Sequence, residues 1–329
     1  MKRILITGGA GFIGSHLADA LLARGDTVTV VDDQSTGNLA NLAQAQRSDR
    51  FRFVPGSVAD RDLVRRLIAD VDVVYHLAAA VGVQLIARDP VRTIETNIYP
   101  TELILAELKL RHDRGESVKL FLASTSEVYG KNPRPRWTEE DDLVFGPTTR
   151  ARWSYGVSKA VDEFLALAYA REHGLPLVIA RFFNVVGPRQ SGAYGMVLPR
   201  LVDAALRGGP LVVHDDGQQV RCFAHVADVV GAVMALMETP AALGRVFNVG
   251  SDQPVKILDL ARRVAAVVDP ELPIHFQSYA EAYSPDFEDV RSRVPDLTRL
   301  RETIDFHLRH DLDAIIRDVI ASKKRLNAE

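Results

Sequence analysis

Residues 2–33, which read KRILITGGAGFIGSHLADALLARGDTVTVVDD, decide the fold of this chain. The stretch opens with a short apolar run of strand length and breaks at the glycine-rich turn 8–14. An amphipathic segment follows and ends near Gly25, as helices often do, before a β-branched apolar run, 27–31, that stops at Asp32. Strand, glycine turn, helix, strand and acid in this order predict the first β-α-β unit of an α/β fold.

The glycine turn and the acid are typical of a dinucleotide site. Glycines let backbone N–H groups approach a pyrophosphate at the N-terminus of a helix, where the helix dipole favours anions. The carboxylate of Asp32 would hydrogen-bond the adenosine ribose hydroxyls and repel a 2′-phosphate, so the sequence predicts NAD rather than NADP. The predicted contacts of the turn are Gly8, Gly11, Phe12, Ile13 and Gly14.

Strand-length runs and helical patterns alternate through the first half of the chain, which predicts a Rossmann-type, doubly wound parallel sheet. The expected strands are 3–7, 27–31, 52–55, 71–77, 119–124 and 177–181, and the expected helices are 16–23, 61–69, 91–112 and 155–173. After residue 181, prolines punctuate shorter elements, which indicates a smaller α/β lobe. The predicted domains are an NAD-binding domain, 1–181 plus about 222–250 with a last strand at 245–250, and a substrate-binding lobe, about 182–221 plus 251–329.

Composition excludes several classes of function. The net charge of -3 and the isoelectric point near 6.3 give no basic footprint for nucleic acid. A single cysteine, Cys222, excludes an intrachain disulfide, and the nine histidines show no paired ligand spacing, so no metal site is expected. No apolar stretch is long enough for a membrane span, and the N-terminus has no signal-peptide layout. We therefore expect a cytoplasmic enzyme without a membrane or nucleic-acid partner.

A second motif, Tyr155 and Lys159, carries acid–base chemistry. Side chains four residues apart on a helix share one face, so the ammonium can lie beside the phenol. A nearby positive charge would lower the pKa of the phenol from about 10 and make it a base for a hydroxyl proton. Thr125 would add a hydrogen bond to the same hydroxyl. The spacing also occurs by chance on surface helices, and the nucleotide motif favours the catalytic interpretation.

The spacing G-x-x-G-x-x-G at 8–14, with Tyr155 and Lys159 downstream, resembles the extended short-chain dehydrogenase/reductase family of nucleotide-sugar enzymes, over nearly the whole chain. The resemblance implies a homodimer through a four-helix interface of helices 91–112 and 155–173, whose apolar residues would otherwise be buried within the monomer. It also implies further NAD contacts, of which Ser57 stands where the family usually has Asp: Asp33, Ser35, Thr36, Gly37, Ser57, Val58, Leu77, Ala78, Ala79, Asn97, Tyr155 and Lys159.

Residues 124–130, STSEVYG, distinguish reactions within this family. Dehydratases typically carry an Asp where this chain has Ser126, and simple 4-epimerases lack the acid found at Glu127. The motif resembles that of the UDP-glucuronic acid decarboxylases, and the stretches RWSY at 152–155 and EDVRSRVP at 288–295 agree. The resemblance implies that Glu127 and Arg293 act at the carboxylated end of the sugar.

The implied reaction starts when Tyr155 takes the O4′ proton while NAD⁺ oxidises C4′. The resulting 4-ketone lies β to the carboxylate, so CO₂ leaves and Thr125 and Tyr155 stabilise the enolate oxygen. Glu127, or a water it orients, would handle the proton at C5′, and Arg293 would position the carboxylate. The product would be UDP-xylose or its 4-keto form. A 4-epimerase acting on UDP-glucuronic acid or a UDP-hexose remains an alternative, as does, more remotely, a non-catalytic NAD sensor.

The resemblance places the contacts to the UDP-sugar substrate more loosely. Met196 stands where known decarboxylases tend to carry Arg, which keeps other sugars open. The implied substrate contacts are Val81, Glu127, Asn184, Val197, Arg200, Val213, Arg221 and Arg293.

Overall fold

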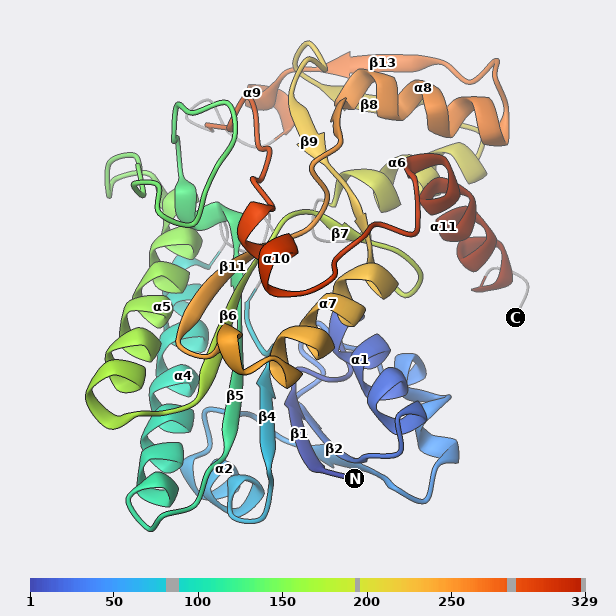
Figure 1. The fold of residues 1–329 in the computed structure, drawn as a ribbon. Helices are drawn as coiled ribbons and strands as arrows, with labels where there is room; N and C mark the ends of the chain where they lie inside the picture. The colour runs from blue at the N-terminus through green and yellow to red at the C-terminus, as the bar shows by residue number, and fades with distance from the viewer. Residues whose placement is uncertain (81–88, 193–195, 283–287, 327–329) are drawn as a thin grey trace.

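The computed structural model describes residues 1–80, 89–192, 196–282 and 288–326. Its centre is a sheet of seven strands in the order β11-β6-β5-β4-β1-β2-β3, in which every neighbouring pair is parallel (Figure 1). Most of its strand residues are buried, as strands covered on both faces require. The strands are β1 Arg3–Thr7, β2 Thr27–Asp32, β3 Phe51–Pro55, β4 Val73–His76, β5 Lys119–Thr125, β6 Leu177–Phe182 and β11 Arg245–Val249.

Helices cover both faces of this sheet (Figure 1). They are α1 Phe12–Ala23, α2 Arg61–Ile68, α4 Pro90–His112, α5 Ser154–His173, α7 Val226–Glu238 and α10 Thr298–Thr303. Residues of α1, α7 and α10 share one buried apolar cluster with one face of the sheet. Residues of α2, α4 and α5 form a second cluster on the other face. The sheet therefore separates two apolar cores, and the predicted Rossmann-type α/β class is confirmed.

The remaining elements are shorter, and many of them surround a third apolar core built from α6, α8, α11 and β8. They are β7 Val185–Val186, α6 Val197–Leu206, β8 Leu211–His214, β9 Val220–Cys222, β10 Ala224–His225, β12 Pro254–Lys256, α8 Ile257–Val268, β13 Ile274–Gln277, α9 Tyr279–Ala282 and α11 Leu312–Leu326. The 3₁₀ turns are η1 Leu39–Leu42, η2 Ala45–Arg47, η3 Ser126–Tyr129, η4 Ala151–Trp153 and η5 Pro240–Ala242. The division into two domains stays a prediction.

The structure contains each strand expected from the sequence, with ends that differ by at most two residues. The late strand 245–250 joins the sheet as β11 beside β6. The first helix begins at Phe12 rather than His16, because Gly11 is its N-cap and the glycine turn runs directly into it. Within the described ranges, no helix combines the length and apolar content that a bilayer crossing needs. The compartment stays a prediction.

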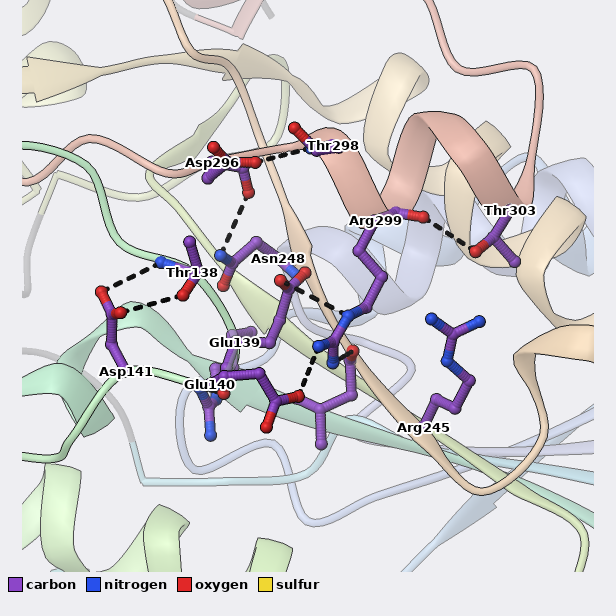
Figure 2. Close-up of polar contacts among 12 residues, drawn as sticks. Thr138, Glu139, Glu140, Asp141, Arg245, Asn248, Asp296, Thr298, Arg299 and Thr303 are labelled. Atoms are coloured by element: carbon purple, nitrogen blue, oxygen red, sulfur yellow. Dashed lines mark hydrogen bonds and ion pairs between the residues drawn. The ribbon is translucent and has the colours of Figure 1, made fainter.

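Asn248, on the edge strand β11, connects the sheet to two loops that lead to the cavity described below (Figure 2). Its backbone N–H donates to Glu139 Oε1 at 2.7 Å, and its side-chain amide donates to the carbonyls of Trp137 and Asp296 at 2.8 and 3.2 Å. Its amide oxygen accepts a hydrogen bond from the Tyr129 hydroxyl at 2.7 Å. One fully buried side chain thus fixes the chain after η3 against the segment that follows Arg293.

The glycine turn is tight because backbone atoms occupy the space of side chains. A Cβ atom at Gly14 would lie 2.5 Å from the carbonyl oxygen of Gly8 and 2.7 Å from Gly9 Cα. Gly8 itself has φ +70°, a conformation that residues with a Cβ rarely adopt. The turn therefore brings backbone, rather than side chains, to the N-terminus of α1.

We predict that Gly14→Ala lowers the free energy of unfolding by about 1–3 kcal/mol, the usual result of overpacking, and abolishes NAD binding. Gly231→Ala is the matched control, because Gly231 lies in α7 and a Cβ atom there would meet no neighbouring atom of the described residues within 4 Å. This control should leave stability unchanged or higher. Urea denaturation and NAD titration calorimetry measure both effects. Normal NAD affinity in Gly14→Ala would contradict the role of the turn.

Candidate active site

A cavity of about 1030 Å³ opens at the carboxyl ends of the sheet strands, where the strand order reverses between β1 and β4. Ligands of open α/β sheets bind at this kind of crevice. Most of the predicted NAD contacts line it: Gly8, Gly11, Phe12, Ile13, Gly14, Asp32, Asp33, Ser35, Thr36, Gly37, Ser57, Val58, Leu77, Ala78, Ala79 and Tyr155. Of the other predicted residues, Thr125, Ser126, Glu127, Asn184, Val197, Arg200, Arg221 and Arg293 also line it.

The nucleotide end of the cavity fits NAD. Gly11 caps α1 without a side-chain hydrogen bond, so the first N–H groups of the helix stay available for a pyrophosphate. The Asp32 carboxylate accepts backbone N–H groups of Ala10 at 2.9 Å and Gln34 at 2.7 Å, and each oxygen keeps a lone pair for a ribose hydroxyl. Burial raises the pKa of Asp32, and these two hydrogen bonds counteract the increase.

Three predicted site residues do not line the cavity, and a fourth lies outside the described residues. Asn97 accepts from the Ala80 N–H at 2.9 Å and donates to Ser158 at 3.0 Å, so it holds α4 against α5 rather than lining the cavity. Val213 is fully buried in the third core, because alternate residues of β8 face inward, and His214 lines the cavity in its place. Lys159 is buried behind the cavity wall, and Val81 falls outside the described residues.

Tyr155 lies in the first turn of α5, beside Thr125 at the end of β5. The expected decrease in its pKa is wrong for this arrangement: burial raises the pKa of the phenol, the charges of Glu127 and Asp162 raise it further, and a hydrogen bond with Thr125 lowers it only in part. The physical reason is that the Lys159 ammonium contacts Asp162, with 2.7 Å between Nζ and Oδ2. Lys159 is therefore already paired.

Glu127 lies in η3, directly after β5, with its carboxylate between two buried guanidiniums. Arg152 Nη1 lies 2.6 Å from Oε2 and Arg293 Nη1 lies 2.7 Å from Oε1. Burial would raise the pKa of Glu127, but the two arginines outweigh it and hold the pKa far below its usual range. A carboxylate with so low a pKa is a weak base, so the structure favours an electrostatic role over proton transfer at C5′.

Local packing fixes this arrangement of charges. A Cβ atom at Gly156 would lie 2.5 Å from the carbonyl oxygen of Glu127, so the glycine lets α5 approach η3 closely. Arg293 arrives from the other side: its Nη1 donates to Ser126 Oγ at 3.4 Å, and the Trp137 N–H donates to the carbonyl of the next residue, Val294. Segments far apart in the sequence therefore meet at one carboxylate.

A second charge pair continues the wall beyond Arg293. Arg221 Nη2 lies 2.9 Å from Asp289 Oδ2, and the Tyr279 hydroxyl donates to the same oxygen at 2.7 Å. Burial would raise the pKa of Asp289, but Arg221, Arg293 and this hydrogen bond hold it below its usual value. Among the described residues of this wall, Arg152, Arg221 and Arg293 face the two carboxylates of Glu127 and Asp289, a balance of about +1 that favours an anionic ligand.

Sequence reasoning missed three wall residues, Arg152, Tyr279 and Asp289. The stretch 152–155 was visible as a resemblance, but nothing in its spacing showed that Arg152 reaches Glu127 from a 3₁₀ turn. Asp289 stands next to Glu288 in a charge-rich segment, and only the fold shows that its side chain is 19% exposed and that of Glu288 36%.

We predict that Glu127→Gln lowers the free energy of unfolding by about 3–5 kcal/mol, because it leaves the guanidiniums of Arg152 and Arg293 without the carboxylate between them. Adding Arg152→Gln to this variant should recover part of the loss, since one of the two like charges is then gone. A double-mutant cycle by urea denaturation at neutral pH measures the coupling. Strictly additive losses would show that the two side chains do not interact.

Comparisons with known proteins agree with this site. The model of the NAD dependent epimerase/dehydratase family matches residues 4–250. The chain is 40% identical over 308 residues to a UDP-N-acetyl-alpha-D-glucosaminuronate decarboxylase of Bacillus cytotoxicus, covering 93% of this chain and 92% of that protein. It is 34% identical over 322 residues to UDP-glucuronic acid decarboxylase 1 of Arabidopsis thaliana, covering 96% and 69%.

A solved structure leads to the same family. UDP-glucuronic acid 4-epimerase from Bacillus cereus, in complex with UDP-glucuronic acid and NAD, matches with a TM-score of 0.87 at 27% identity, covering 98% of this chain and 99% of that one. Sheet order, glycine turn and family model are thus consistent, and the chain belongs to the NAD dependent epimerase/dehydratase family of enzymes.

Proposed function

We propose that this enzyme uses NAD to decarboxylate UDP-glucuronic acid to UDP-xylose or its 4-keto form. The observation that carries the proposal is the Glu127 carboxylate between the buried guanidiniums of Arg152 and Arg293, in the same cavity as Tyr155. Relatives named as decarboxylases of UDP-linked uronic acids, at 34% and 40% identity, support the reaction, and the family description supports NAD.

The two arginines give the site a reason to prefer a carboxylated sugar. Two buried guanidiniums face the one carboxylate of Glu127, so this part of the wall favours a further anion. Arg293 also has a buried Nε atom without a hydrogen-bond partner among the described residues. The C5′ carboxylate of a uronic acid would supply the missing negative charge and accept this donor, whereas the hydroxymethyl group of a hexose would supply no charge.

The catalytic steps follow from the side chains around the sugar. Bound NAD⁺ supplies the oxidant for C4′. Tyr155 accepts the O4′ proton, and the Thr125 hydroxyl, which shares a hydrogen bond with Tyr155, orients the same oxygen. Once C4′ is a ketone, the electrons of the bond to the carboxyl carbon can move toward the ketone oxygen as CO₂ leaves. Tyr155 and Thr125 then stabilise the enolate oxygen by hydrogen bonds.

The 4-epimerase alternative shares every step up to the ketone, and Glu127 favours decarboxylation.

A second possible substrate is supported by a relative. The relative at 40% identity is named for UDP-N-acetyl-alpha-D-glucosaminuronate, which carries an acetamido group at C2′. The arginine pair would contact the carboxylate of either uronic acid in the same way. The two substrates therefore differ at the C2′ side of the cavity and not at Glu127.

Proton NMR of the protein with NAD⁺ and, separately, each of the two UDP-uronic acids tests the proposal. We expect UDP-xylose or its 4-keto form from UDP-glucuronic acid. Faster conversion of the acetamido sugar would retain decarboxylation and change the substrate. Formation of UDP-galacturonic acid without loss of carbon would replace the decarboxylase by the epimerase, and no reaction with either sugar would contradict both.

We predict that Tyr155→Phe abolishes oxidation at C4′, because the base is lost. Glu127→Gln should slow CO₂ loss more than oxidation, because the neutral amide no longer aligns the two arginines. Single-turnover measurement of NADH and CO₂ separates the two steps. Glu271→Gln, at an exposed position far from the cavity walls, is the matched control. An unchanged rate of CO₂ loss in Glu127→Gln would remove Glu127 from its role.

We also propose a homodimer through α4 and α5, which lie side by side on one flank of the molecule (Figure 1). Val157, Val161 and Phe164 repeat at positions i, i+4 and i+7 of α5 and are all exposed, Phe164 by 66%. The neighbouring α4 exposes four more large apolar side chains: Val91, Ile94, Tyr99 and Leu110. Several exposed large apolar side chains on two neighbouring helices are typical of a protein interface.

We predict that Phe164→Glu makes the protein monomeric, because the substitution would bury a charge in the interface. Phe276→Glu, at a 57% exposed phenylalanine on β13, should leave the oligomeric state unchanged. Light scattering during size-exclusion chromatography distinguishes the two results. A dimer that survives Phe164→Glu would exclude this surface.

A further inference from the structure

Lys159 has a buried partner that its motif does not contain. Its Nζ atom lies 2.7 Å from Asp162 Oδ2, one helical turn further along α5, and the two side chains are 3% and 0% exposed. Asp162 Oδ1 is buried without a hydrogen bond of ordinary geometry. The sequence motif Tyr-x-x-x-Lys explains Tyr155 and Lys159, whereas Asp162 is a carboxylate that the catalytic steps above do not use.

The surroundings leave Asp162 as the group that pairs with the ammonium. His76, on β4, faces Lys159, but burial and the charge of Lys159 lower the pKa of this histidine to about 3, so it is neutral at physiological pH. Glu163, the next acid on α5, makes three hydrogen bonds with Arg181 of β6. On the α4 side, the Thr101 hydroxyl contacts Asp162. Among the described residues of α4, no charged side chain acts on Asp162.

Tyr155 is surrounded differently. Glu127 faces it from η3, Thr125 from β5, and Asp162 from its own helix. Arg152 and Arg293 already contact Glu127. Lys159 is the cation that the motif places on the same helix face as Tyr155, and a carboxylate in direct contact with its ammonium cancels most of that charge at any more distant atom.

We propose that Asp162 is a positioning residue for Lys159 and Tyr155: by binding the ammonium of Lys159, it withholds that charge from the phenol of Tyr155. The inference rests on the proposed function only in treating Tyr155 as the base. The inference adds that Asp162 influences the pH range in which the Tyr155 side chain can accept a proton. Water cannot take the place of either partner of the Lys159–Asp162 ion pair, because both side chains are almost completely shielded from solvent.

A titration of the nucleotide-free protein tests the proposal without any substrate. Carbon-13 labelling of tyrosine Cζ lets NMR follow each phenol with pH, and Tyr155→Phe assigns the signal. We expect Tyr155 to remain a phenol beyond pH of about 10, the reference value of free tyrosine. A midpoint well below that value would overturn the proposal, whatever reaction the enzyme catalyses.

The variant Asp162→Asn then shows whether Asp162 acts through its negative charge or only through its place in the structure. With the carboxylate removed, the ammonium acts on the phenol, and the Tyr155 midpoint should fall by about one pH unit or more. The acidic limb of the pH profile for NADH formation should move by the same amount in the same direction. Glu172→Gln, an exposed acid on the same helix, controls for the change of net charge and should move neither.

Asp162→Ser serves if the asparagine variant does not fold, and thermal melting identifies the folded variants. A folded variant of either kind with an unchanged Tyr155 midpoint would overturn the proposal. These NMR outcomes do not depend on whether the proposed decarboxylase function is correct. Failure of the wild-type enzyme to act on a UDP-uronic acid would not alter the NMR midpoints.

Discussion

The site depends on one buried carboxylate, Glu127, held between the guanidiniums of Arg152 and Arg293. Moving these charges out of water is expensive, so the arrangement persists only where geometry is fixed on every side. Three segments provide that geometry: η3 after β5, η4 before α5, and the chain around Arg293. The sheet brings the first two together, and the loops tied to Asn248 hold the third (Figure 2).

Two neighbouring groups have opposite pKa shifts for clear reasons. Glu127 is ionised because two cations outweigh its burial, whereas Tyr155 stays a phenol because burial and nearby carboxylates act together. Both pKa shifts depend on which carboxylate each cation contacts. The arginines contact Glu127 and the lysine contacts Asp162, so charge at the sugar's carboxyl end and charge at the phenol are controlled separately.

Much of this architecture could be predicted from the sequence. Buried parallel strands are continuous apolar runs, and the glycine turn has a fixed backbone requirement, so β1 and the NAD end of the cavity were readable. Pairings between distant residues were not: nothing in the spacing shows that Arg152 or Arg293 meets Glu127. Val213 was misplaced because one residue along a strand changes the face to which a side chain points.

The most direct test of the account is the rate of C4′ oxidation, followed as single-turnover NADH formation, for UDP-glucuronic acid against UDP-glucose. The two sugars differ only in whether a carboxylate is present to meet the arginine pair. We predict that UDP-glucose reacts about 100-fold or more slowly, because it offers no carboxylate to the guanidiniums of Arg152 and Arg293. Equal rates for the two sugars would contradict the claim that the Arg152–Glu127–Arg293 cluster selects the substrate.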